Sequence, residues 1–213
     1  MIAAFGLKFI IPGFLIAVIC SLWGASRNSV LIFILAIVFA LLTLFLTFFY
    51  RNPIRKIPSE KNLILSIADG TVLSVKDIEN DYIGGKGKKV SIFLSVFDVH
   101  INRLPIDGRV EYVKYNPGKF HMAMVDKASD DNENCEIGLE FNKGKMIFKQ
   151  IAGFLARRIE YTIKEGDMAK AGDIYGMIHF GSRAELFLPE NVEVVVKKDD
   201  KVLGGETIIG RVK

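Results

Sequence analysis

Residues 30–50 read VLIFILAIVFALLTLFLTFFY, 21 consecutive residues without a charged side chain. A membrane-spanning helix needs about 20 apolar residues at a rise of 1.5 Å per residue, so this stretch predicts a transmembrane helix. A second apolar stretch of 17 residues, 9–25, precedes it. The polar break between them, Ser26-Arg27-Asn28-Ser29, is only four residues long. The two stretches together therefore favour a helical hairpin.

Pro12 and Gly13 weaken the first helix, and a shallow re-entrant or interfacial segment is the alternative for residues 9–25. Lys8 precedes the hairpin, and a basic cluster at residues 51, 55 and 56 follows it. These cations predict that both ends of the hairpin, and the body after it, lie on the cytoplasmic side of the cell membrane. A signal peptide would be one short apolar stretch, so the second span argues against removal.

The charges divide the chain into two regions of different character. Of 28 Lys and Arg and 24 Asp and Glu, only Lys8 and Arg27 lie in residues 1–50. We therefore expect a membrane-anchoring hairpin at 1–50 and a folded body at 51–213. The body carries 26 cations and 24 anions, which is too even a balance to predict nucleic-acid binding. Cys20 and Cys135 form no C-x-x-C or Cys/His pattern, so neither a disulfide framework nor a metal site is expected.

The body reads as short β-branched runs separated by Gly, Asp and Asn, a pattern typical of antiparallel strands. The predicted strands are residues 63–67, 70–75, 89–94, 108–113, 145–151 and 159–163. Only residues 153–158 look helical. The run Gly84-Gly85-Lys86-Gly87 has no helix after it, so we interpret it as an ordinary loop and not as a phosphate-binding loop.

Residues 165–176 are echoed by residues 199–210, about 34 positions later, with little identity. Both read as a charged Asp/Lys corner followed by Gly and a short strand, which suggests paired turn–strand units. Such units are frequent in barrel-sandwich domains of the lipoyl-carrier kind. The predicted fold is therefore β-rich α+β with barrel-sandwich elements, preceded by the transmembrane hairpin.

General catalytic motifs do not name a reaction. The chain has three histidines, His100, His121 and His179, and lacks a G-x-S-x-G elbow, a P-loop and an H-E-x-x-H pair. The residues alone thus predict a membrane-tethered β domain and do not identify its reaction.

One longer stretch is more specific. Residues 93–108 read FLSVFDVHINRLPIDG, which resembles the histidine-bearing motif of the phosphatidylserine decarboxylases, in the short branch that includes archaetidylserine decarboxylases. Further segments of that family follow in the same order over residues 47–213. They are Ala68-Asp69-Gly70, Pro117-Gly118-Lys119-Phe120 with 126–129 and 132–134, Gln150-Ile151-Ala152-Gly153 with 156–159, and Phe180-Gly181-Ser182-Arg183 before 186–189.

The resemblance implies an enzyme that makes its own cofactor. Ser182 would attack the carbonyl of Gly181, and elimination and hydrolysis would leave a covalent pyruvoyl group at the start of a small chain, residues 182–213. The amine of the substrate would form a Schiff base with that group, which accepts the electrons released when CO2 leaves. A glycine at 181 suits a strained turn that the hydroxyl must approach.

The resemblance also assigns helper residues. His100 would transfer protons, as donor to the carbanion. Asp69 would belong to a charge relay that orients a histidine and activates Ser182; a plain Asp-Gly turn is the alternative. The larger bacterial branch has a second histidine where this chain has Arg103. Either His100 therefore serves both self-cleavage and decarboxylation, or His179 assists in one of them.

Several cations are candidate contacts for the lipid phosphate or the substrate carboxylate. They are Arg103, Lys119, Lys127, Arg157, Arg158 and Arg183. Solvated surface charge is the alternative for each. The expected partners are a membrane phospholipid and the two chains produced by cleavage, and a homo-oligomer is left open. Archaetidylserine is the alternative substrate, and a non-enzymatic membrane-tethered barrel-sandwich adaptor is the alternative of another class.

Overall fold

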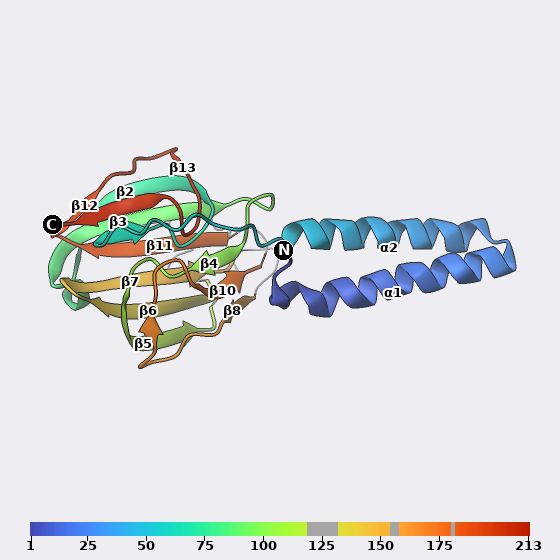
Figure 1. Ribbon diagram of the computed structural model, residues 1–213, viewed down its shortest axis with the longest axis horizontal. Coiled ribbons are helices and arrows are strands. Elements are labelled where there is room, and N and C mark those ends of the chain that lie inside the picture. Colours follow the sequence, from blue (N-terminus) through green and yellow to red (C-terminus); the bar gives the residue numbers. More distant parts are fainter. Residues whose placement is uncertain (119–131, 154–157, 180–181) are drawn as a thin grey trace. The chain divides into compact units, whose positions relative to one another are not determined.

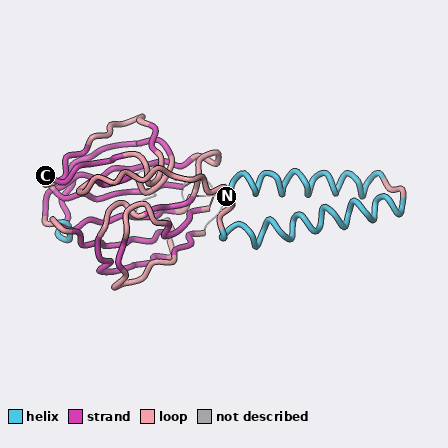
Figure 2. The backbone as a smooth tube through the Cα atoms, in the orientation of Figure 1, coloured by secondary structure: helices cyan, strands magenta, loops and turns pink. Residues whose placement is uncertain are grey.

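The computed structural model describes residues 1–118, 132–153, 158–179 and 182–213 (Figure 1). It separates the chain into two compact units, Met1–Ile54 and Arg55–Lys213. The first unit is helical and the second is built from strands (Figure 2).

The N-terminal unit is a pair of helices, α1 (Ala4–Arg27) and α2 (Val30–Phe49). Asn28 ends α1 in the left-handed conformation, with φ 49°, and reverses the chain into α2. At 1.5 Å per residue, the 24 residues of α1 and the 20 of α2 span about 36 and 30 Å. Both helices are long and apolar enough to cross a membrane. The predicted pair of apolar helices is confirmed, and α1 continues through Pro12.

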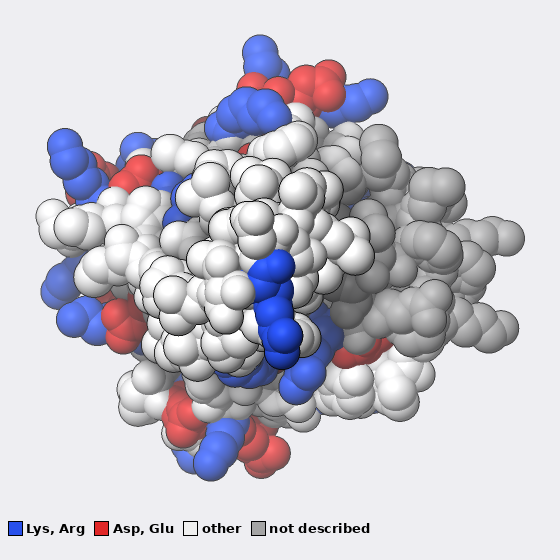
Figure 3. All heavy atoms as spheres, turned by 90° about the vertical axis from the view of Figure 1, so that its right-hand side faces the viewer, with Lys and Arg blue, Asp and Glu red and all other residues white. Residues whose placement is uncertain are grey.

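Small residues let the two helices approach each other. A Cβ added at Gly13 would lie 2.7 Å from Oγ1 of Thr43, and one at Gly6 would overlap the side chain of Tyr50. Gly13 therefore serves helix packing, as small residues commonly do in membranes. Most of the exposed large apolar side chains belong to this unit, and its end view is mainly uncharged surface (Figure 3). Such a surface suits contact with lipid.

The second unit contains fourteen described strands and one short 3₁₀ helix. The elements are β1 (Leu63–Leu65), β2 (Gly70–Asn80), η1 (Asp81–Ile83), β3 (Gly85–Leu94), β4 (Ile101–Arg103), β5 (Gly108–Asn116), β6 (Asn134–Phe141), β7 (Gly144–Ile151), β8 (Ile159–Tyr161), β9 (Met168–Ala169), β10 (Ile174–Ile178), β11 (Ser182–Pro189), β12 (Val192–Val194), β13 (Lys201–Val202) and β14 (Ile208–Val212).

The strands form a curled antiparallel sheet of eight, in the order β13-β2-β3-β11-β7-β6-β5-β9, and two sheets of three, β1-β14-β12 and β4-β10-β8. One buried apolar cluster joins side chains from all three sheets. The strand β11 lies near the middle of the large sheet and has a partner on each edge. The β-rich α+β prediction is confirmed.

All six predicted strand segments contain strands, with shifted ends. The second and third extend into a long hairpin, because β2 runs to Asn80 and β3 starts at Gly85. The connection between them is η1 (Asp81–Ile83) and Gly84, which has φ 92°, so of residues 84–87 only Gly84 lies outside β3. The prediction of a loop for residues 84–87 was therefore wrong for its last three residues. The predicted helical stretch 153–158 lies mostly outside the described residues.

The echo between residues 165–176 and 199–210 is a real structural repeat. The amide of Lys164 donates to Oδ2 of Asp167 at 2.8 Å, and that of Lys197 donates to Oδ2 of Asp200 at 2.9 Å. Each turn leads into a two-residue strand at one edge of the large sheet, β9 beside β5 and β13 beside β2. Each repeated turn thus supplies the short strand at one edge of the large sheet.

The two strands next to these edge strands, β2 and β5, also begin alike. Asp69-Gly70 stands at the start of β2 and Asp107-Gly108 at the start of β5. The two glycines are required by close approach: a Cβ at Gly70 would overlap the carbonyl oxygen of Phe93, and one at Gly108 that of Glu140. The Asp-Gly pairs are therefore matching elements of a duplicated unit.

Candidate active site

Ser182 is the first residue of β11 and is fully buried. It lies opposite Leu94 of β3, and the next residue, Arg183, lies opposite Ile151 of β7. Within the part of the chain that the structure describes, the hydroxyl of Ser182 has no hydrogen-bond partner. Since buried polar groups are normally satisfied, an unpaired hydroxyl at this position is a candidate reactive group.

His100 follows the strand whose last residue, Leu94, pairs with Ser182. The turn at residues 95–98 connects β3 to β4, and the amide of Ile178 donates to the carbonyl of His100 at 3.2 Å. His100 therefore pairs with a residue four positions before Ser182, while Leu94 pairs with Ser182 itself. The segment that carries His100 is therefore hydrogen-bonded to the end of β10, and the strand before it, β3, pairs with the start of β11.

The ring of His100 is fully buried and oriented by its own turn. Its Nδ1 lies 3.0 Å from the carbonyl oxygen of Asp98. Because a carbonyl can only accept, this contact places a proton on Nδ1.

Asp69 forms an ion pair with Arg55, which the sequence predicted to belong to the basic cluster after the hairpin. Nη2 of Arg55 donates to both carboxylate oxygens, at 2.8 and 2.7 Å, and the amide of Gly204 donates to Oδ1 at 2.8 Å. Both side chains are over 90% buried, so Arg55 is an internal ion-pair residue and not a surface charge. Burial raises the pKa of Asp69 despite these donors. Among the described residues, no hydrogen bond joins Asp69 to a histidine.

Arg103, at the position of the larger branch's second histidine, lies in the same neighbourhood. Its Nη1 donates to the carbonyl of Gly172 at 2.9 Å. Burial, followed by the nearby charge of Arg55, lowers its pKa, and the charge of Asp69 opposes this. Arg103 is therefore electrostatically coupled to the Arg55–Asp69 pair.

The other predicted cations are separated from Ser182 or lie outside the described residues. Arg183 points to the opposite face of the sheet, because successive side chains of a strand alternate. There its Nη2 is 2.7 Å from Oε1 of Glu185 and donates to Oγ of Ser91 at 3.0 Å. Arg158 is exposed, with Nε 3.5 Å from Oε1 of Glu160. Lys119, Lys127, Arg157 and Gly181 lie outside the described residues, as does His121.

His179 has an acidic neighbour. Its Nε2 lies 3.3 Å from Oε1 of Glu160, and its amide donates to the carbonyl of Arg158 at 3.1 Å. The side chain is about 95% buried. This arrangement suits a residue held in place by its backbone hydrogen bond and by its acidic neighbour.

Two buried amides were part of the sequence motifs but received no role there. Nε2 of Gln150 donates to Oδ1 of Asn102 at 2.8 Å, which links β7 to the strand that follows His100. Both side chains are fully buried. Only the tertiary pairing could identify them, because the two residues are 48 positions apart.

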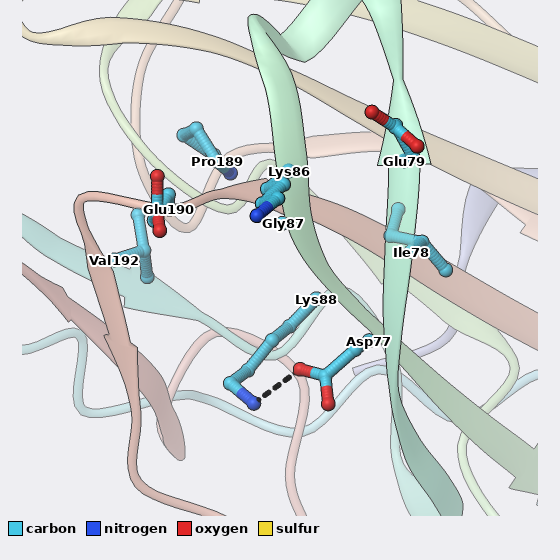
Figure 4. Close-up of a pocket in the computed structure, with 9 residues that line it drawn as sticks. All are labelled: Asp77, Ile78, Glu79, Lys86, Gly87, Lys88, Pro189, Glu190 and Val192. Atoms are coloured by element: carbon cyan, nitrogen blue, oxygen red, sulfur yellow. Dashed lines mark hydrogen bonds and ion pairs between the residues drawn. The ribbon is translucent and has the colours of Figure 1, made fainter.

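The pocket in Figure 4 is a separate feature. Its lining comes from β2, β3, the end of β11, Glu190 and Val192 of β12. On one side of it, Nζ of Lys88 is 2.7 Å from Oδ1 of Asp77 on the adjacent strand. Pro189 pairs with Gly87 at this end, and Ser182 is seven residues away along the strand. At about 3.3 Å per residue, the pocket is roughly 23 Å from Ser182.

Comparison with known proteins agrees with these motifs. Residues 42–210 match the family model described as phosphatidylserine decarboxylase. A phosphatidylserine decarboxylase proenzyme of Carboxydothermus hydrogenoformans is 49% identical over 183 residues, 85% of this chain and 86% of the relative. One of Geobacter metallireducens is 42% identical over 210 residues, 98% of this chain and 95% of the relative. By the family model and the similarity to these relatives over most of its length, the chain belongs to the phosphatidylserine decarboxylase family.

Proposed function

We propose that this protein is a self-processing, pyruvoyl-dependent decarboxylase that converts phosphatidylserine to phosphatidylethanolamine. The observation that carries the proposal is Ser182, whose buried hydroxyl lacks a partner among the described residues and stands at the start of the central strand β11. The curated relatives named proenzymes support a chain that is cut.

Self-cleavage follows from the chemistry of serine. Oγ attacks the carbonyl carbon of Gly181, the peptide C–N bond breaks, and the hydroxyl proton ends on the freed amine, which leaves an ester. Loss of the Cα proton of residue 182 then breaks the Cβ–Oγ bond and releases the large chain as a carboxylate. One water hydrolyses the remaining enamine, so ammonia departs and a pyruvoyl group begins the small chain.

The residues around Ser182 fit such a group. After cleavage, β11 would still pair with β3 and β7 on its two edges, and β13 and β14 would still pair with β2 and β1. The small chain therefore stays bound through its strands, and its first residue keeps its place. The pyruvoyl carbonyl would supply the electron sink that a decarboxylation needs and that no natural side chain provides.

His100 is the proposed proton carrier. The carbonyl of Asp98 fixes the proton on Nδ1, so Nε2 would exchange protons with Oγ of Ser182 during cleavage and with the substrate carbon after CO2 has left. Asp69 would act on this site through the charge of its Arg55 pair and through Arg103, which is coupled to both.

The helical hairpin would hold the catalytic unit at the membrane that contains its substrate. We propose that both helices span the membrane and that the catalytic unit lies on the cytoplasmic side, where Arg51 and Lys56 follow α2. The acyl chains of the substrate can then stay in the bilayer while the headgroup reaches Ser182.

The decisive test compares wild type with Ser182→Ala in detergent micelles. Wild type should give two chains, with a pyruvoyl group on the smaller by mass spectrometry, and release CO2 from phosphatidylserine. Ser182→Ala should stay whole and inactive. Ser66→Ala, which changes another fully buried serine, should be cut normally.

An intact and fully active wild-type chain would refute the pyruvoyl mechanism. An intact chain that turns over no lipid would favour the non-enzymatic adaptor. Cyanoborohydride with substrate should label the small chain, and a label on a lysine elsewhere would count against the assignment. Assays with phosphatidylserine and archaetidylserine in parallel decide between the two lipid backbones.

A further inference from the structure

A buried pair of amides connects the His100 segment to the strand beside Ser182. Nδ2 of Asn102 donates to the carbonyl of Ile67 at 3.3 Å, and Oδ1 of Asn102 accepts from Nε2 of Gln150 at 2.8 Å. Neither amide is exposed to solvent.

The donor and acceptor directions of these hydrogen bonds fix the orientation of both side-chain amides. The carbonyl of Ile67 can only accept, so Asn102 must direct its NH2 group towards it and its oxygen towards Gln150. Gln150 must then donate to that oxygen with its own NH2 group. Oε1 of Gln150 is left as a pure acceptor, buried and without a donor among the described residues. A buried acceptor of this kind needs a donor to offset its loss of water.

The strand register brings this acceptor close to Ser182. Gln150 lies directly opposite Ala184, so the two side chains share a face of the sheet. Ser182 is two residues along β11 on the same face, which makes it a diagonal neighbour at about 7–8 Å between Cα atoms, within reach of a long side chain. The hydroxyl of Ser182 also lacks a partner among the described residues. Two unsatisfied polar atoms thus occupy neighbouring positions beside the proposed cofactor.

We propose that Oε1 of Gln150 accepts a hydrogen bond from the amino group of the substrate headgroup. This inference rests on the proposed function. A serine headgroup contains a phosphate, a carboxylate and an amine, and only the amine has N–H groups to donate. Gln150 would therefore hold the amine next to the carbonyl derived from Ser182 and would disfavour headgroups whose nitrogen carries no hydrogen.

Gln150→Met tests the assignment, because it keeps the length of the side chain and removes both amide functions. In full-length protein in micelles with phosphatidylserine, it should be cut like wild type. Its kcat/KM should then fall about ten- to hundredfold, the loss expected for a hydrogen bond to a charged group. The rate at which cyanoborohydride adds substrate mass to the small chain should fall by a similar factor.

Tyr175→Phe is the matched control. The hydroxyl of Tyr175 is another buried polar atom without a partner among the described residues. The Tyr175 side chain belongs to the buried apolar cluster of the second unit. Its removal should leave cleavage, kcat/KM and the trapping rate within about twofold of wild type.

Three results would overturn the inference. The first is a Gln150→Met protein that matches wild type in turnover and trapping. The second is a Gln150→Met protein that stays uncut, which would assign the residue to self-cleavage instead. Gln150→Glu is the second variant if Gln150→Met does not fold, because it retains an acceptor and should trap substrate within about tenfold of wild type. The third result against the inference is a folded Gln150→Glu protein that does not trap substrate. A wild-type chain that does not process would overturn the proposed function itself, before any variant is made.

Discussion

Asp69 and Asp107 occupy equivalent positions in the two halves of the duplicated unit. Each carboxylate accepts a backbone N–H at 2.8 Å, Asp69 from Gly204 and Asp107 from Ala171. They differ in their surroundings: Asp107 is exposed, whereas Asp69 is buried against Arg55. The Asp-Gly turn is therefore a structural element in both halves, and Asp69 has an added ionic role in one.

This difference predicts unequal effects of the same substitution. Asp69→Asn removes the buried carboxylate that binds Arg55 and leaves the guanidinium, among the described residues, with only Glu206, at 4.0 Å. It should lower the free energy of unfolding by about 3 kcal/mol, whereas Asp107→Asn should cost less than about 1 kcal/mol. Denaturation in the Ser182→Ala background measures both without interference from cleavage. In the wild-type background, we expect Asp69→Asn to slow cleavage on a gel and Asp107→Asn to leave it unchanged. Equal effects at the two positions would show that the Arg55 pair contributes nothing.

The buried pair of Arg183 and Glu185 predicts a role in stability. Glu185→Gln should destabilise the fold by about 3 kcal/mol because it leaves Arg183 without its carboxylate. The double variant Arg183→Met with Glu185→Leu should recover most of this loss, since apolar residues of similar volume can replace a buried ion pair.

The same double variant separates packing from substrate binding. Arg183 lies on the face opposite Ser182, so KM for phosphatidylserine should stay within about threefold of wild type once stability is restored. A stable double variant with a KM raised tenfold or more would instead support the binding role that the sequence suggested for Arg183.

His100 and His179 should behave differently when substituted. His100→Asn should reduce turnover by at least about a hundredfold, the usual loss when a proton carrier is removed. His179→Gln should retain most of the turnover, because its ring is engaged with Glu160. CO2 release from protein that is already cut measures turnover, and a gel time course measures cleavage. If His179→Gln blocked cleavage alone, the two steps would be divided between the histidines.

Cys135 should resist alkylation in the folded protein. Burial, with a smaller effect of the charge of Glu136, raises its pKa to about 12, so only about one thiol in ten thousand is ionised at pH 8. Because the folded pKa lies above the unfolded value near 8.5, the contribution of Cys135 to stability is complete below that pH and is lost as the pH rises through 12. Mass spectrometry after iodoacetamide, in a Cys20→Ser background, should find label only after denaturation. Rapid labelling of native protein at pH 8 would contradict the burial of Cys135.

The sequence by itself determined the apolar hairpin, the β-rich body and the choice of Ser182 as the candidate reactive residue. These features are local: an uncharged run of 21 residues is long enough to span a membrane whatever follows it. The alternation of β-branched runs with turn residues likewise predicts strands without reference to their partners. The order of the family motifs pointed to Ser182 and His100 in the same way.

Only the tertiary structure decided which residues meet. Whether a cation is a surface charge or an ion-pair partner depends on what packs over it, so Arg55 could be assigned to Asp69, and Arg183 to the far face of the sheet, only from the fold. Gln150 acquired a candidate role for the same reason, because its neighbours Asn102 and Ala184 are distant in sequence and are brought to it by strand pairing. A strand's register fixes which side chains share a face, and that register is set by the whole sheet.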